Sequence, residues 1–126
     1  MKVNDNKRRA SVLKPPRDFK KFFQIARKVH GKNFILYHWS SSELLKGEVE
    51  FACVASRKSV SKRAIRRNKA KRRIKAAVYD FFSQNNVNRN MKIFIAAKNT
   101  AVSVAWEELL LELHKAMARI LKGNEN

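Results

Sequence analysis

The residues best suited to chemistry in this chain are eleven lysines and arginines between Arg57 and Lys75, a stretch without any acidic residue. An arginine guanidinium can hold a phosphate through two parallel hydrogen bonds, and a lysine ammonium binds phosphate as a point charge. Asn68 lies among them, and its amide both donates and accepts hydrogen bonds. These residue types predict binding to a polyanion. The candidate contact residues are Arg57, Lys58, Lys62, Arg63, Arg66, Arg67, Asn68, Lys69, Lys71, Arg72 and Lys75.

Apolar residues at helical spacing run through and beyond the same stretch, which a disordered basic tail would lack. Residues 57–63 show no regular period and are interpreted as a loop. A helix is predicted from Ala64 to Phe82, with cations opposite its apolar stripe. The apolar set is Ala64, Ile65, Ala70, Ile74, Ala77, Val78, Phe81 and Phe82. A solvated basic face is the alternative, but no acid is available here to relieve like-charge repulsion. We therefore expect the helix to lie against a nucleic acid.

Composition supports the same partner. A chain of 126 residues predicts one domain, and 29 Lys and Arg against 10 Asp and Glu give a net charge of +19. Such charge repels itself unless a counter-charged partner is present. The apolar faces are needed for a core, no lipidation motif occurs and no apolar run approaches a membrane span, so nucleic acid is favoured over a membrane surface. Cys53 is the only cysteine, predicted to be a buried strand thiol. We expect no secretory signal and a cytoplasmic protein.

The elements that must position these cations follow from periodicity and breakers. We expect a flexible basic arm over 1–14, a single RNA-binding domain over 15–122 and a tail over 123–126. Within the domain the pattern predicts a helix from Pro15 to about Lys28, strands over 33–39, 49–55 and 91–97, the basic helix, and an amphipathic helix over 106–121. The first two strands are a possible hairpin, and there is room for a third strand before the basic helix. Ser103 is a plausible N-cap for the last helix, and Gly123 is expected just past its end.

The order of the basic residues resembles a family signature. The run Arg67-Asn68-Lys69-Ala70-Lys71-Arg72-Arg73-Ile74-Lys75 resembles the Arg-Asn-Arg-x-Lys-Arg-x-x-Arg signature of the bacterial ribonuclease P protein component. Residues 13–23, 31–37 and 51–58 are similar to its opening, its first strand and a later strand end, so the likeness spans about residues 13–121. Lys69 and Lys75 stand where the family usually has arginine, and Arg73 replaces a usual apolar residue. The loop before the helix also lacks the common glycine.

This resemblance implies an α+β fold. It is an α/β sandwich of order α-β-β-β-α-β-α, with a left-handed strand-helix-strand crossover around the signature helix. It also implies a role as the protein subunit of ribonuclease P, with the catalytic RNA and precursor tRNA as partners. The holoenzyme removes the 5′ leader of precursor tRNA by phosphodiester hydrolysis, while Mg²⁺ is held mainly by the RNA subunit and substrate.

The resemblance implies roles for individual residues as well. The signature residues would meet the catalytic RNA, and Phe19, Phe23 and Tyr37 match positions that line a cleft for the single-stranded leader. Bases stack on aromatic rings with little sequence preference, which suits such a cleft. From spacing alone, Phe19 and Phe23 are interpreted more readily as core residues, whereas the hydroxyl of Tyr37 favours a polar or wet surrounding.

Signatures of protein-based catalysis are missing from the sequence. His30, His38 and His114 are scattered, and none forms a metal-ligand pair with Cys53. The chain has three glycines and no glycine-rich phosphate loop. The acidic residues Glu107, Glu108 and Glu112 are interpreted as solubilising residues of the last helix. We expect no catalytic side chain, and the alternative function is a ribosomal or other structural RNA-binding protein without a catalytic complex.

Overall fold

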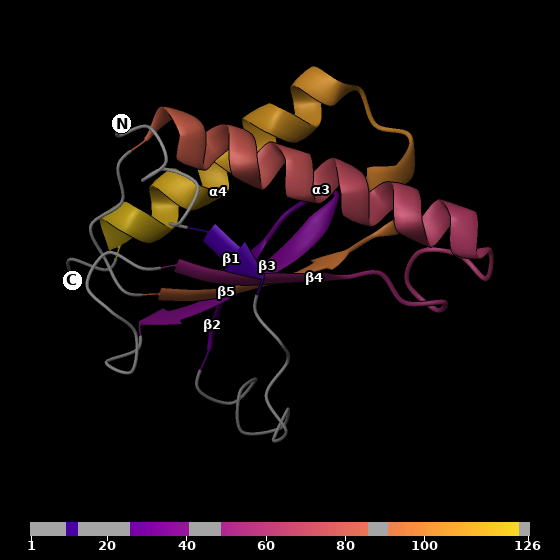
Figure 1. Cartoon of the computed structure of the whole chain (residues 1–126), viewed down its shortest axis with the longest axis horizontal. Coiled ribbons are helices and arrows are strands. Elements are labelled where there is room, and N and C mark those ends of the chain that lie inside the picture. The colour runs from indigo at the N-terminus through magenta and orange to yellow at the C-terminus, as the bar shows by residue number, and fades with distance from the viewer. Residues whose placement is uncertain (1–9, 13–25, 41–48, 86–90, 124–126) are drawn as a thin grey trace.

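Two helices cover one face of a five-stranded sheet (Figure 1). The computed structural model describes residues 10–12, 26–40, 49–85 and 91–123. Their elements are β1 (Ala10–Val12), β2 (Arg27–His30), β3 (Phe34–Ser40), β4 (Val49–Val54), α3 (Ala64–Gln84), β5 (Met91–Ala97), a 3₁₀ turn η1 (Asn99–Val102) and α4 (Trp106–Gly123). From β2 onward this is the predicted order β-β-β-α-β-α, so the mixed α+β fold class is confirmed.

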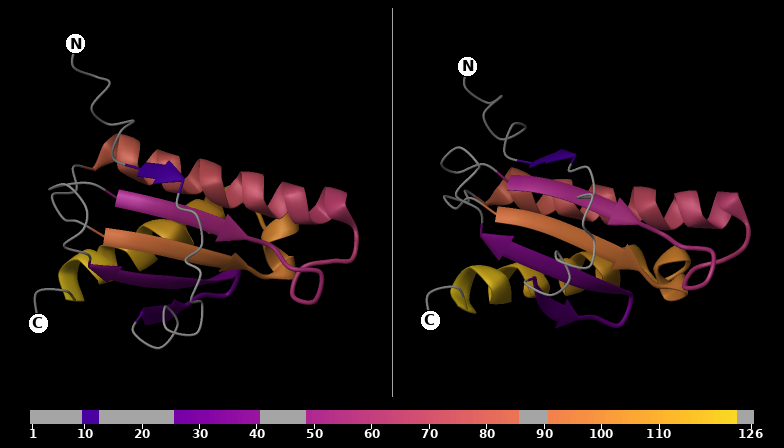
Figure 2. Two further views of the ribbon diagram at one scale, coloured as in Figure 1. Left: turned by 60° about the horizontal axis from the view of Figure 1, so that its bottom comes forward. Right: turned by 90° about the horizontal axis from the view of Figure 1, so that it is seen from below.

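The sheet has the order β1-β4-β5-β3-β2, with β5 at its centre. β4 pairs with β5 in parallel, Val49 opposite Met91, whereas β3 pairs with β5 antiparallel, Phe34 opposite Ala97. α3 connects the parallel pair, and the views in Figure 2 show that this crossover is left-handed, as the family resemblance implied. The possible hairpin between 33–39 and 49–55 is wrong, because β3 pairs with β2 and β5 instead.

The core forms between the helices and the sheet because the strands alternate. Met91, Ile93 and Ile95 of β5 are fully buried toward the helices, and the intervening residues point to the other face. The buried stripe of α3 is Ala70, Ile74, Ala77, Val78, Phe81 and Phe82, close to the predicted set. Each large apolar side chain buried in this way contributes roughly 1.5–3 kcal/mol. This packing presents the opposite, cationic side of α3 to solvent.

Both helix predictions were wrong at individual positions. Ile65 was placed in the apolar pattern of α3, yet it is 82% exposed, and Ala64 is exposed as well. On α4 the apolar spacing predicts a buried stripe of Trp106, Leu110, Leu113, Met117 and Ile120. The last three are buried as predicted, together with Leu109 and Ala116, whereas Trp106 is exposed and Leu110 is only partly buried.

Several predicted boundaries also need correction. Ala10–Val12, assigned to the flexible arm, forms β1 and pairs in parallel with β4. Arg27 and Lys28, predicted to end the first helix, belong to β2, and Ala26 before them is not helical. The rest of that predicted helix, residues 15–25, lies outside the described residues. Ser103 is not the N-cap of α4, which begins at Trp106, and Gly123 is the last residue of that helix.

The turn between β2 and β3 is tied to α4 by Glu112. Its carboxylate accepts hydrogen bonds from the backbone N–H groups of Lys32 and Asn33, and from Asn33 Nδ2 at 2.6 Å. A Cβ on Gly31 would lie only 2.9 Å from the Phe34 carbonyl oxygen and would collide with Glu112, so glycine is required there. The interpretation of Glu112 as merely solubilising is therefore wrong.

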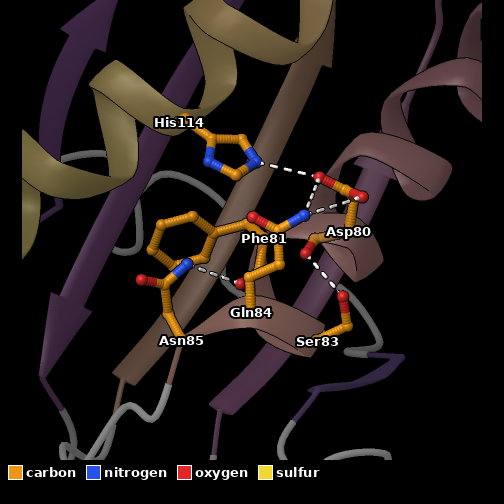
Figure 3. Close-up of polar contacts among 6 residues, drawn as sticks. All are labelled: Asp80, Phe81, Ser83, Gln84, Asn85 and His114. Atoms are coloured by element: carbon orange, nitrogen blue, oxygen red, sulfur yellow. Dashed lines mark hydrogen bonds and ion pairs between the residues drawn. The ribbon is translucent and has the colours of Figure 1, made fainter.

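A polar cluster joins the second half of α3 to α4 (Figure 3). The Asp80 carboxylate pairs with His114 Nε2 at 3.1 Å and accepts hydrogen bonds from the Gln84 amide. The His114 ring also meets the Phe81 ring edge-on, with 5.2 Å between centroids. Ser83 and Asn85 donate hydrogen bonds to backbone carbonyls of the last turn. This cluster keeps the acid of Asp80 on the α4 side of the helix.

Candidate nucleic-acid interface

The predicted contact residues gather on α3 and on the loop before it. Arg66, Asn68, Lys69 and Arg72 are exposed, because the apolar stripe of the same helix faces the sheet. Arg67, Lys71 and Lys75 are half-buried along one side of the helix, and the loop cations Arg57, Lys58, Lys62 and Arg63 are all exposed. The structure thus brings all eleven predicted residues into one continuous segment at the molecular surface.

Hydrogen bonds shape the loop that carries the first cations. The Ser56 hydroxyl accepts a hydrogen bond from the Ser59 backbone N–H at 2.9 Å and also contacts the Ser59 hydroxyl. The Val60 N–H donates to the Ser56 carbonyl at 2.9 Å, and the Val60 side chain is buried in the core. A serine turn anchored by one apolar residue therefore forms this connection without the glycine that is common in the family.

Arg67 also stabilises the loop before α3, a role that the signature does not predict. Its Nη1 donates hydrogen bonds to the backbone carbonyls of Ser61 at 3.1 Å and Lys62 at 2.8 Å. These bonds hold the loop against the first turn of α3. Arg67 therefore positions the neighbouring cations, and only the rest of its guanidinium is left for a phosphate.

The start of α3 concentrates positive charge. Its N-cap residue, Arg63, makes no side-chain capping bond, and the first turn contains no acidic residue. A helix N-terminus carries the positive end of the macrodipole, which most helices offset with Asp, Glu or a capping oxygen. Here the dipole adds to the field of the surrounding side chains, and the local potential favours an anionic partner.

Arg73 stabilises the fold through hydrogen bonds to backbone carbonyls. Its guanidinium donates to the carbonyls of Ala101 at 3.0 Å, Val102 at 3.1 Å and Val104 at 2.5 Å. It thereby satisfies three backbone acceptors in the segment that leads from η1 to α4. The sequence signal for this role was the arginine at a position that is usually apolar in the family signature.

Cys53 packs under the basic helix. It is partly buried on the helix-facing side of β4, and burial raises the pKa of its thiol to about 12, although the nearby charges of Lys75 and Lys71 act in the opposite direction. A thiol with so high a pKa stays protonated and unreactive at neutral pH. The predicted strand position of this thiol is confirmed, whereas the predicted full burial is not, since Cys53 is only partly buried.

The second candidate site lies on the other face of the sheet. Tyr37 is half-buried there, with its ring edge-on to Phe94 at 6.1 Å between centroids. Two residues further along β3, the Trp39 ring lies under Lys92, whose Nζ is 5.6 Å from the ring centroid. Phe19 and Phe23 lie outside the described residues. Sequence reasoning missed Trp39 and Phe94, although strand alternation places Trp39 on the same face as Tyr37.

The described residues provide no metal centre. Among them, no three His, Cys, Asp or Glu side chains gather in a group that could hold a metal ion. In the same part of the chain, no helix is long and apolar enough to cross a membrane. The chemistry that the two surfaces offer is therefore phosphate binding on α3 and ring contacts on the opposite face of the sheet.

Comparison with known proteins gives one consistent family. The family model described as Ribonuclease P matches residues 8–121. The structure is similar to a Staphylococcus aureus RNase P protein, with a TM-score of 0.67 and 20% identity, covering 85% of this chain and 92% of that one. It is also similar to the Thermotoga maritima RNase P protein, with a TM-score of 0.63 and 19% identity, covering 86% of this chain and 96% of that one. No curated protein sequence gives a significant match.

Proposed function

The chain belongs to the ribonuclease P protein family, and from its role as that enzyme's protein subunit we propose that it binds the catalytic RNA through α3. The observation that carries this is the family match over residues 8–121, which includes the whole basic segment. The exposed cations Arg66, Lys69 and Arg72 support the assignment of α3 to RNA. The rival function, a ribosomal or other structural RNA-binding protein, has no support from the comparisons.

The proposed contact between α3 and the catalytic RNA is mainly electrostatic. Each phosphate that a lysine or arginine neutralises releases counterions, so affinity falls steeply as salt rises. Arg67 and the serine turn fix the loop cations relative to the helix, which lowers the entropy lost on binding. The result is a preorganised surface for the sugar-phosphate backbone of a folded RNA.

We assign the opposite face of the sheet to the 5′ leader of precursor tRNA. Tyr37, Phe94 and Trp39 supply rings for a single strand, and Lys92 supplies positive charge beside them. Since every base has a stackable face, such a surface suits leaders of different sequence. In this arrangement the protein holds two RNA molecules on two surfaces, and its positive charge reduces their mutual repulsion.

We propose that the hydrolysis itself belongs to the RNA subunit. Mg²⁺ bound by RNA and substrate would activate water and stabilise the departing oxygen. Among the described residues, no three His, Cys, Asp or Glu side chains gather in a group that could hold such an ion. The contribution of this chain is to bind, orient and retain the leader. We assign this work to the cytoplasm, in keeping with the single cysteine.

Reconstitution tests this function directly. The protein mixed with a bacterial ribonuclease P RNA and a leader-bearing precursor tRNA at low Mg²⁺ should stimulate cleavage at the mature 5′ end. The measurement is the initial rate with and without protein, and the control is the RNA alone at high Mg²⁺, where it should cleave unaided. Tight RNA binding without any stimulation would contradict the proposal and favour the structural RNA-binding alternative.

The Tyr37→Ala variant should lose leader affinity while it keeps affinity for the catalytic RNA. Base stacking on an aromatic ring contributes roughly 1–3 kcal/mol, so the Kd for precursor tRNA should rise about 5- to 150-fold. Tyr37→Phe retains the ring beside Phe94 and should bind nearly as the parent protein does. The measurement is holoenzyme affinity for tRNA with and without a leader. An equal loss for both substrates would exclude Tyr37 from the leader site.

A further inference from the structure

The outward side of α3 carries two exposed apolar residues on one line. Ile65 is 82% exposed and Tyr79 is 45% exposed, and Arg72 lies midway between them, also exposed. Seven residues are about two helical turns, so the three side chains share one face and the ends of the line are about 21 Å apart. Ala76, the exposed residue between Arg72 and Tyr79, is small and allows close approach to the helix there.

The side chains of Ile65 and Tyr79 contribute little to the core of the fold. The core contacts of α3 come from its opposite stripe, from Ala70 to Phe82. Within residues 10–12, 26–40, 49–85 and 91–123, no hydrogen bond or ring contact involves the side chain of Tyr79. A large apolar side chain left in water forgoes the free energy that its burial would contribute. A partner that covers this line would recover that free energy.

Charge selects the partner. No acidic residue occurs from Ser56 to Tyr79, and the next one, Asp80, points toward α4 and is bonded to His114 and Gln84. A second copy of the chain would bring another net charge of +19 against this surface. RNA brings phosphates for Arg72, with unpaired bases and ribose rings for the apolar ends. The chemistry of the line therefore fits RNA and opposes self-association.

We propose that Ile65 and Tyr79 are nucleotide-contacting residues at the two ends of the α3 interface with the catalytic RNA. Tyr79 stacks its ring on an unpaired base, Ile65 packs against a base or ribose, and Arg72 neutralises a phosphate between them. This inference rests on the function proposed above. It adds to the electrostatic contact two apolar contacts that do not depend on counterions, and it gives α3 a defined position along the RNA.

Salt dependence distinguishes the two kinds of contact. Tyr79→Ala should raise the Kd for the catalytic RNA about tenfold at every salt concentration, within the range that stacking contributes, and leave the log Kd against log salt slope unchanged. Ile65→Ala should act in the same way with a smaller effect, about threefold. Tyr79→Phe keeps the ring and should bind nearly as the parent does. Arg72→Ala, in contrast, should flatten the slope by about one phosphate contact.

Leu111→Ala is the matched control, because Leu111 is an apolar residue 57% exposed on α4, away from the basic segment. It should leave RNA affinity unchanged. If Tyr79→Ala and Ile65→Ala behave like Leu111→Ala while Arg72→Ala still weakens binding, this inference is wrong and the proposed function stands. If Arg72→Ala also has no effect on affinity or slope, the proposed α3 interface itself fails. Loss of a protein dimer in sedimentation of Tyr79→Ala, at unchanged RNA affinity, would overturn the inference in favour of self-association.

Discussion

Replacing Arg66, Lys69 and Arg72 together by alanine should weaken binding to the catalytic RNA at least about a hundredfold at low salt. All three side chains are exposed, and within the described residues none makes a hydrogen bond or ion pair. Each charge-assisted hydrogen bond that they donate to phosphate contributes roughly 1.5–3 kcal/mol. The log Kd against log salt slope should flatten by about 2 to 3, since each phosphate contact contributes roughly 0.7–0.9.

A matched triple variant separates this surface from net charge. Lys115, Arg119 and Lys122 are exposed cations of α4, so replacing them by alanine removes the same charge from another part of the molecule. That control should change affinity through long-range attraction only, by much less than the α3 variant does. Equal losses in the two triple variants would mean that overall charge, and not the α3 surface, sets the affinity. Thermal unfolding should show that both variants stay folded, because alanine is the best helix former.

Arg73→Ala should lower the free energy of unfolding by about 2–4 kcal/mol, although Arg73 belongs to the same basic run. The variant leaves the carbonyls of Ala101, Val102 and Val104 without their donor, and hydrogen bonds to a charged group contribute roughly 1.5–3 kcal/mol each before discounting for partial exposure. The loss should appear in urea denaturation as a lower midpoint with an unchanged m-value. The melting temperature should fall by roughly 10 °C.

Its neighbour provides the control for this prediction. Arg72, immediately before Arg73 on the helix, is exposed, so Arg72→Ala should change the free energy of unfolding by less than about 0.5 kcal/mol. The two variants should also differ in RNA binding. Folded Arg73→Ala should keep the parent salt slope, because the guanidinium of Arg73 in the parent protein is bonded to carbonyls and not to phosphate. If Arg73→Ala is as stable as Arg72→Ala and its salt slope is flatter than that of the parent protein, Arg73 is a phosphate contact and not a structural residue.

Local pattern was sufficient to predict much of this fold. The strand over Met91–Ala97 and the helix that begins at Ala64 were predicted at nearly their observed bounds, because a buried strand and an amphipathic helix each show their period within a few residues. β1 was missed because three residues have no period of their own, and this strand exists through parallel pairing with β4. β2 was missed because the helical spacing predicted for Pro15 to Lys28 was extended into it, whereas Arg27 and Lys28 pair with β3.

The sequence by itself determined the charge, the family and the helix that carries the signature, because these depend on residue identity and short spacing. Only the tertiary structure decided which charged side chains remain available. Arg73 binds carbonyls 28 to 31 residues away, and Glu112 binds backbone groups 79 and 80 residues away. Whether a polar group meets RNA or a carbonyl depends on what the fold places within about 3 Å of it. The eleven cations of the acid-free stretch include partly engaged Arg67 and internally bonded Arg73 beside exposed phosphate-binding candidates.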